Sequence, residues 1–187
     1  MAYELLGTIA VAELEVPVEI IGERTRKVSL GGLQVELKKG AKLELPLKAV
    51  LSLIRRGEAS IDPSRLYSIG ELNKIRWKEE QSYQLQKLEP FFYLKARLLI
   101  ELLEQEAMNE PRAQAKIRHI KVCVLDIARS RLNKILKAVL ANPEPSRELM
   151  SLMTLEERAL YVKLCSIVGA WRDSMQRFIE EGDVLEL

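Results

Sequence analysis

Apolar residues follow two different periods along this chain of 187 residues. Up to Ile61 they alternate with polar residues over short stretches, which is the period of a half-buried β-strand. From Ser68 almost to the end they recur every three or four positions, the period of an amphipathic helix. The pattern predicts an α+β chain, with a small N-terminal β-rich module over residues 1–62 and a mainly α-helical domain over residues 66–187.

Two local signals define the first strands of the β-rich module. The alternating stretch at 15–21 contains Pro17, which cannot donate a ladder hydrogen bond and therefore predicts an edge strand. Gly31 and Gly32 stand together between two alternating runs, and glycines supply the positive φ angles of a two-residue hairpin turn. The sequence therefore predicts a β-hairpin over residues 27–37.

One short helix is expected in the same module. Residues 42–45 alternate as a strand, and Pro46 follows at a position where its missing N–H costs nothing, the first turn of a helix. Gly57 is placed to end that helix, and residues 58–62 predict a last strand. A module of about 60 residues is only marginally stable on its own, so we expect it to pack against another surface, either of its own helical domain or of a partner.

Capping boxes and prolines divide the second part into long helices. Ser68 to Glu71 matches the pattern of a capping box, and the helix that it starts is predicted to run to about Glu89. Pro90 interrupts the periodicity, which resumes over residues 91–105. A helix of nearly 30 residues follows between Pro111 and Pro143.

The last helix has the clearest boundaries. Thr154 to Glu157 forms a second capping box, and Gly182 is expected to stop the helix. Helices of this length joined by short connections are typical of a bundle or an irregular helical domain.

Composition argues for a folded, cytosolic protein. Hydrophobic residues make up 48% of the chain, enough for a core, and no uninterrupted apolar stretch of about 20 residues predicts a membrane span. The first residues lack the basic and apolar regions of a secretory signal. Cys123 and Cys165 lie among apolar neighbours without further ligands at metal-binding spacing, so buried, reduced thiols are expected.

No catalytic, cofactor or metal site is predicted. His119 is the only histidine, and it lies beside Arg118 and Lys121, where neither a catalytic triad nor an H-E-x-x-H zinc site can be built around it. The chain contains neither of the glycine-rich motifs that cradle phosphates, G-x-x-x-x-G-K-[ST] and G-x-G-x-x-G. Adjacent acidic pairs such as Glu79 and Glu80 point to different faces of a helix, which favours solvated surface over a carboxylate dyad.

Charge is concentrated in one segment, although the chain carries a net charge of only +2. Residues 112–141 contain eight basic residues and a single acidic one. At 100° per residue, Lys116, Arg131 and Lys134 point in a broadly similar direction, and they are the candidate contacts to nucleic acid. The charge nevertheless wraps around the helix, and the sequence favours a different interpretation, in which the cations neutralise acidic neighbouring helices and cover the core with their aliphatic stems.

Aromatic and aliphatic residues of the helical domain are candidates for a subunit interface. They have two possible roles that sequence does not separate, because aromatic side chains fill cores and are also enriched at interface hot spots. The predicted contacts are Trp77, Phe91, Phe92, Tyr93, Leu132, Leu136 and Trp171.

Four segments of the chain share their order and spacing with a known family. They are residues 40–51, with a strand, Leu45-Pro46 and a short helix; residues 61–80, with the junction and the first long helix; residues 88–99, with proline, aromatics and tyrosine; and residues 129–135, rich in arginine and lysine. Together they resemble a subunit of the GINS complex, a replication factor of archaea and eukaryotes, in the strand-module-first form related to the Psf subunits two and three.

The resemblance implies a fold and a set of partners. Residues 1–62 would be a GINS B-like module and residues 66–187 a GINS A-like domain. It implies a non-catalytic, cofactor-free subunit that pairs with a helical-block-first GINS subunit, as a 2:2 heterotetramer. The complex would bridge the MCM helicase to a RecJ-like or Cdc-type replication protein, with DNA polymerase or primase as further partners, in the cytoplasm and at the nucleoid of an archaeon.

A rival function comes from the basic segment alone. A stand-alone nucleic-acid-binding regulator would use the helix at 112–141, and its affinity would fall steeply with salt. Binding of DNA by the isolated chain favours this regulator, whereas co-purification with a second subunit favours the complex.

Overall fold

The computed structural model describes residues 14–23, 25–30, 33–106 and 111–182. It confirms the α+β organisation, with the described strands before residue 62 and the long helices after it. The chain divides into two compact units that are described separately below. The first comprises residues 1–68 with 95–117, and the second comprises residues 69–94 with 118–187.

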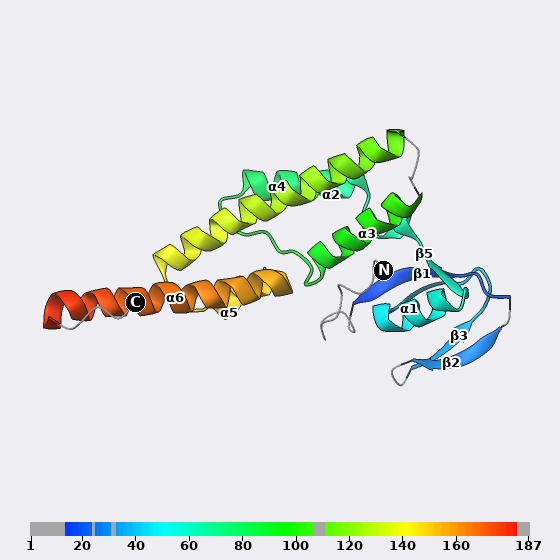
Figure 1. Ribbon diagram of the computed structural model, residues 1–187, viewed down its shortest axis with the longest axis horizontal. Coiled ribbons are helices and arrows are strands. Elements are labelled where there is room, and N and C mark those ends of the chain that lie inside the picture. Colours follow the sequence, from blue (N-terminus) through cyan, green and yellow to red (C-terminus); the bar gives the residue numbers. More distant parts are fainter. Residues whose placement is uncertain (1–13, 24, 31–32, 107–110, 183–187) are drawn as a thin grey trace. The chain divides into compact units, whose positions relative to one another are not determined.

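The first unit contains a three-stranded antiparallel sheet of order β4-β1-β5, of which β1 and β5 are labelled in Figure 1. Its strands are β1 (Glu15–Ile20), β4 (Lys42–Pro46) and β5 (Ala59–Ile61). Helix α1 (Leu47–Arg55) packs on this sheet through Leu47, Val50 and Leu53, which are spaced to share one helix face and are buried. Pro46 is the last residue of β4 and the N-cap of α1, so it precedes the first turn in which it was predicted. Gly57 closes α1 as predicted, with a φ of +69° that suits a glycine.

The edge position predicted for Pro17 is wrong, because β1 is the central strand. The register explains how a proline is tolerated there. The carbonyl of Pro17 accepts a bond from the amide of Asp62, so its backbone faces the β5 side of the sheet. Pairing with β5 begins only at Val18 opposite Ile61. The missing donor of Pro17 therefore lies just beyond the end of the β5 ladder.

The predicted hairpin is confirmed by the pairing of β2 (Arg26–Leu30) with β3 (Leu33–Leu37). Leu30 pairs with Leu33, which leaves Gly31 and Gly32 as the two-residue connection. Both glycines lie outside the described residues, so the type of turn stays a prediction.

Five helices follow the η3 turn (Pro63–Arg65). They are α2 (Ile69–Gln81), α3 (Phe92–Glu106), α4 (Pro111–Ala141), α5 (Arg147–Ser151) and α6 (Leu155–Glu181). The second capping box is present at Thr154 and Glu157, and Gly182 caps the end of α6 with a φ of +74°. None of these described helices carries an apolar stretch long enough to cross a bilayer.

The prediction that the first long helix continues to Glu89 is wrong, because α2 ends at Gln81. Side chains near this point capture the backbone amides that a continuing helix would use. The hydroxyl of Ser82 accepts from the amide of Gln84, and the carboxylate of Glu79 accepts from the amide of Gln86. Such local bonds compete with helix formation, so residues 82–91 form a loop instead.

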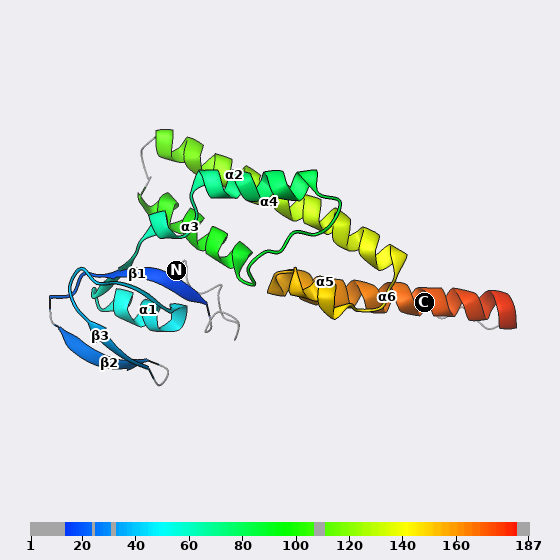
Figure 2. The ribbon, with the colours of Figure 1, turned by 180° about the vertical axis from the view of Figure 1, so that it is seen from behind.

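Packing in the second unit centres on the C-terminal half of α4, the α2–α3 loop, α5 and α6. The core cluster contains Leu85, Ile135, Val139, Met153, Tyr161 and Cys165. In Figures 1 and 2 the C-terminal half of α6 extends past the end of α4. That half of α6 is largely exposed on all sides.

Candidate subunit interface

Arg131 lies at the centre of a buried polar network on the inner face of α4. Its side chain is fully buried, and its five N–H donors make five hydrogen bonds. Nε and Nη2 each lie 2.7 Å from a different oxygen of the Glu157 carboxylate, a paired geometry that suits guanidinium. Nη1 lies 2.9 Å from Oε2 of Glu79. The charge of the buried arginine is thus matched by carboxylates from two other helices.

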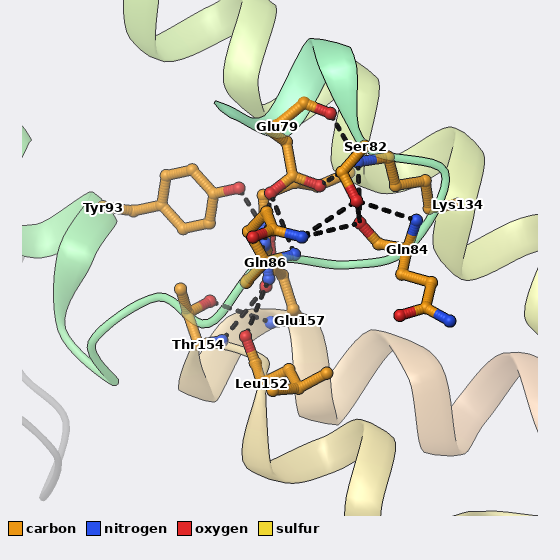
Figure 3. A network of polar contacts seen from close by, with 10 residues as sticks. Glu79, Ser82, Gln84, Gln86, Tyr93, Lys134, Leu152, Thr154 and Glu157 are labelled. Atoms are coloured by element: carbon orange, nitrogen blue, oxygen red, sulfur yellow. Dashed lines mark hydrogen bonds and ion pairs between the residues drawn. The ribbon is translucent and has the colours of Figure 1, made fainter. Parts of the chain in front are cut away.

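The remaining donors of Arg131 bind backbone carbonyls in two segments that connect helices. Nη1 donates to the carbonyl of Gln86 in the α2–α3 loop, and Nη2 donates to the carbonyl of Leu152 at the end of α5. Figure 3 shows how these groups converge from separate segments. One side chain therefore joins α2, the α2–α3 loop, α5 and α6 to α4.

Lys134, one turn further along α4, completes the charge balance. Its Nζ lies 2.5 Å from Oε1 of Glu79 and also donates to the carbonyls of Glu79 and Gln84. Glu79 is fully buried and receives Arg131 on its other oxygen. Two cations and the carboxylates of Glu79 and Glu157 make the network neutral, which is the condition for keeping charges in an interior.

Glu157 belongs both to the buried network and to the capping box that starts α6. Its Oε2 accepts the amide of Thr154, which closes the capping box, while Oε1 accepts the hydroxyl of Tyr93 at 2.7 Å. Burial would raise the pKa of Glu157, but the hydrogen bonds and charge of Arg131 outweigh it and lower that pKa. Burial and the same carboxylate raise the pKa of Tyr93 well above its usual value, so its hydroxyl stays protonated and donates.

The opposite face of α4 carries a row of exposed apolar side chains. We call it the outer row of α4, and its members are Val122, Leu125, Leu132, Leu136 and Leu140. Successive members are three, seven, four and four residues apart, which at 100° per residue places them within an arc of about 80°. An apolar row of this kind on a solvent-facing helix is typical of a surface that another helix covers.

Helix α6 carries a second exposed row, which we call the row of α6. Its members are Leu160, Ile167, Trp171 and Phe178. They are seven, four and seven residues apart and fall within an arc of about 40°. Trp171 and Phe178 lie in the C-terminal half of α6, most of whose residues are exposed.

The structure separates the predicted interface residues into three groups. Trp77, on α2, is 62% exposed, and Leu132, Leu136 and Trp171 belong to the two exposed rows. Phe92 is buried, so the prediction that it contacts another subunit is wrong: it fills the core next to Tyr93, with their rings edge to face. Phe91 is half-buried.

The predicted nucleic-acid contacts do not form one surface. Lys116 is exposed, but Arg131 is buried and has no free donor for a phosphate, so its predicted contact is wrong. The side chain of Lys134 is 12% exposed and its ammonium is held by Glu79. The spacing at 100° per residue places the three residues on a similar side of the helix, but Arg131 on that side is buried whereas Lys116 is exposed.

Sequence reasoning missed the acidic half of the network. Glu79 was expected on the solvated surface, and Glu157 was expected to act only as a capping residue. An available signal was the spacing of Arg131 and Lys134, three residues apart on a helix side shared with the buried Ile127. Two cations on an otherwise apolar side require buried carboxylates to balance them.

The described residues hold no group of three or more side chains that could bind a metal ion. His119 is exposed, and its Nε2 lies 3.2 Å from the Asn73 amide oxygen, to which the Sγ of the buried Cys123 also donates at 3.8 Å. Burial raises the pKa of the Cys123 thiol, which disfavours the thiolate that a nucleophile needs.

Comparison with protein-family models relates the chain to a known family. The Sld5 family model, the GINS complex protein helical bundle domain, matches residues 66–176. The match covers more than half of the chain and contains the buried network, the outer row of α4 and most of α6. No curated protein matches the chain. The chain belongs to the GINS family and is a subunit of that DNA replication complex.

Proposed function

We propose that this chain is a non-catalytic, structural subunit of GINS that assembles with a second GINS subunit of the helical-block-first type into a 2:2 heterotetramer. The observation that carries the proposal is the outer row of α4, which lies inside the family match and leaves five apolar side chains exposed. An assembly partner would remove these side chains from water, which is a favourable process of roughly 25 cal/mol per Å² of apolar area.

The proposed contacts are the exposed members of the predicted set. Trp77, Leu132, Leu136 and Trp171 present apolar area to solvent, and tryptophan is among the residues most enriched at interface hot spots. Phe91 and Tyr93 are half-buried and offer less of their surface. The partner surface is expected to be apolar and helical, with spacing that interlocks with the outer row of α4.

The proposed role of the assembly is to bridge proteins at the replication fork. The strand module comes first in this chain, ahead of the family-matched helical region, as in the strand-module-first type. In this proposal the complex connects the MCM helicase to a RecJ-like or Cdc-type protein and to DNA polymerase or primase. Its location would be the cytoplasm and nucleoid of an archaeon.

Co-expression tests the assembly directly. The chain is purified alone and with a candidate helical-block-first subunit, and the mass of each sample in solution is measured by light scattering. The expected result is a stable complex with two copies of each chain. A monomer that ignores every such candidate contradicts the proposal.

The same samples test the rival function, DNA binding by the isolated chain. Arg131 is buried and the ammonium of Lys134 is paired with Glu79, which removes two of the three predicted contacts, and Lys116 keeps its exposure. Binding of labelled single-stranded or duplex DNA that falls steeply with salt and is lost in Lys116→Ala would support the regulator.

A further inference from the structure

A pocket of about 430 Å³ lies in the second unit, away from both exposed rows. Three segments line it: the α2–α3 loop, the C-terminal part of α4, and α5. Ala138, one of its lining residues, lies about 160° around α4 from Leu136, so the pocket occupies a different side of the helix from the outer row. A ligand bound in this pocket would therefore not block the proposed subunit interface.

The floor of the pocket is apolar and firmly held. Leu85 is buried in the core cluster, and Leu149 and Leu152 pack against the same cluster. The nearby Lys134 is fixed by Glu79 and by the carbonyl of Gln84, and Figure 3 shows these groups together with Leu152. A floor positioned by the buried network is a preformed seat for an apolar side chain.

The rim of the pocket carries one charge of each sign. Lys137 enters from α4 and Glu148 from α5, and both are exposed. Within the described parts of the chain neither side chain forms an ion pair or hydrogen bond, with each other or with another group. Tyr83 stands on the loop side and is fully exposed. A rigid ring in this position offers contact area at a small cost in conformational entropy.

We propose that this pocket binds a short linear segment of a partner protein, in which an apolar side chain lies between an acidic and a basic residue. The apolar side chain occupies the seat above Leu149 and Leu152. The carboxylate pairs with Lys137 and the cation pairs with Glu148, while Tyr83 packs against the segment. The pocket is open to solvent and its two charges stand on different helices, which suits an extended chain better than an enclosed small molecule.

Two fluorescent peptides of ten residues test the proposal by anisotropy. One has the core Glu-Leu-Leu-Lys and the other the reversed core Lys-Leu-Leu-Glu, in otherwise identical neutral sequences. The full chain, in its purified assembly, is expected to bind one order about fivefold more tightly, because two rim ion pairs together contribute about 1 kcal/mol. Replacing both leucines of the peptide by alanine is expected to abolish binding.

A charge swap makes the test specific to this pocket. In the double variant Lys137→Glu with Glu148→Lys the preference between the two peptide orders is expected to reverse, and in Tyr83→Ala both affinities are expected to fall. All three positions are exposed, so the fold should be unaffected. Lys163→Glu, an exposed change on α6, is the matched control and should keep the wild-type preference.

Three outcomes overturn the proposal: no anisotropy change with either peptide, equal affinity for both orders, or a preference that the charge swap leaves unreversed. Mass in solution is measured on the same samples. Loss of peptide binding with an intact tetramer would reject the peptide pocket alone, whereas loss of the tetramer would reject the proposed assembly.

Discussion

Arg131 and Leu132 are consecutive residues of α4 with opposite surroundings. The arginine is fully buried among carboxylates and carbonyls, whereas the leucine is 40% exposed in the outer row. This reverses the usual preference of charged residues for the surface and of leucine for the core, and such reversals are the informative cases. The inner face of α4 is complete within this chain, and the outer face is left for a partner.

The two faces also differ in what stabilises them. The inner face depends on hydrogen bonds that satisfy every donor of Arg131, so the loss of one member leaves an opposite charge buried. The outer row depends only on apolar area, which contributes nothing until a second surface covers it. Changes on the inner face should therefore alter folding, and changes on the outer row should alter assembly.

The largest effect is expected from Arg131→Met. Methionine fills a similar volume but leaves the Glu157 carboxylate buried without its cation, and Glu79 keeps only Lys134. Removing one partner of a buried ion pair costs about 3–5 kcal/mol, so the free energy of unfolding should fall by that amount. Urea denaturation followed by circular dichroism measures it.

Two further variants show whether that loss belongs to the network. Arg129→Met changes an exposed arginine two residues away on the same helix and should cost about 0.5 kcal/mol or less. Adding Glu157→Gln to Arg131→Met should recover part of the stability, because the uncompensated carboxylate is gone. Equal losses in the Arg129 and Arg131 variants would contradict the inner-face assignment.

The next largest effect concerns the outer row. Leu132→Lys with Leu136→Lys should change the free energy of unfolding by less than about 0.5 kcal/mol, since both side chains are already exposed. Association with the second subunit should weaken about 30-fold, because two apolar contacts of about 1 kcal/mol each are replaced by charges. Dilution series followed by light scattering give the dissociation constant.

Val162→Lys is the matched control for this pair. Val162 is an exposed apolar residue of α6 that lies about 160° around that helix from Leu160, outside the row of α6. It should assemble like the wild type. Should it weaken assembly as much as the double variant, the rows would not define the interface.

The elements of the fold could be predicted because their signals are local. The hairpin was marked by two adjacent glycines, and α6 by a capping box and Gly182. The end of α2 was missed because it depends on Glu79 and Ser82 bonding to the loop backbone, a competition that hydrophobic periodicity does not register. The central position of β1 was missed because a proline removes only one backbone donor from a strand. Whether a neighbouring strand needs that donor depends on the register of the sheet, which the sequence of β1 alone does not show.

The site was predicted only in part, for a related reason. Periodicity alone made Leu132 and Leu136 resemble the buried Ile135 and Val139, since all four recur at helical spacing. What separates them is the position of α6, which covers one pair and leaves the other exposed. For Arg131 the interpretation that holds is neutralisation of acidic neighbouring helices, but its partner Glu79 could not be named because it lies 52 positions away in the sequence.

The pH dependence of stability provides a further test of the inner face. The pKa of Glu157 is lowered in the folded chain, so its stabilising contribution is fully present above the ordinary glutamate value of 4.5 and is lost as the pH falls through the lowered value. Glu157→Gln should be less stable than the wild type at neutral pH and should lose less stability on acidification. Urea midpoints measured from neutral to acidic pH give both slopes, and equal slopes would contradict the assignment.

The smallest effect is expected from Tyr93→Phe, which removes one hydroxyl from the inner face. Its bond to Glu157 has a charged acceptor, and bonds of that type contribute about 1.5–3 kcal/mol. Glu157 keeps Arg131 and the Thr154 amide, so the observed cost should lie near the lower end of that range. Tyr83→Phe removes the same hydroxyl from a fully exposed ring and should cost nothing measurable. If the two variants unfold at the same urea concentration, the hydroxyl of Tyr93 adds nothing to the inner face, and the stability of that face rests on Arg131 with its carboxylates.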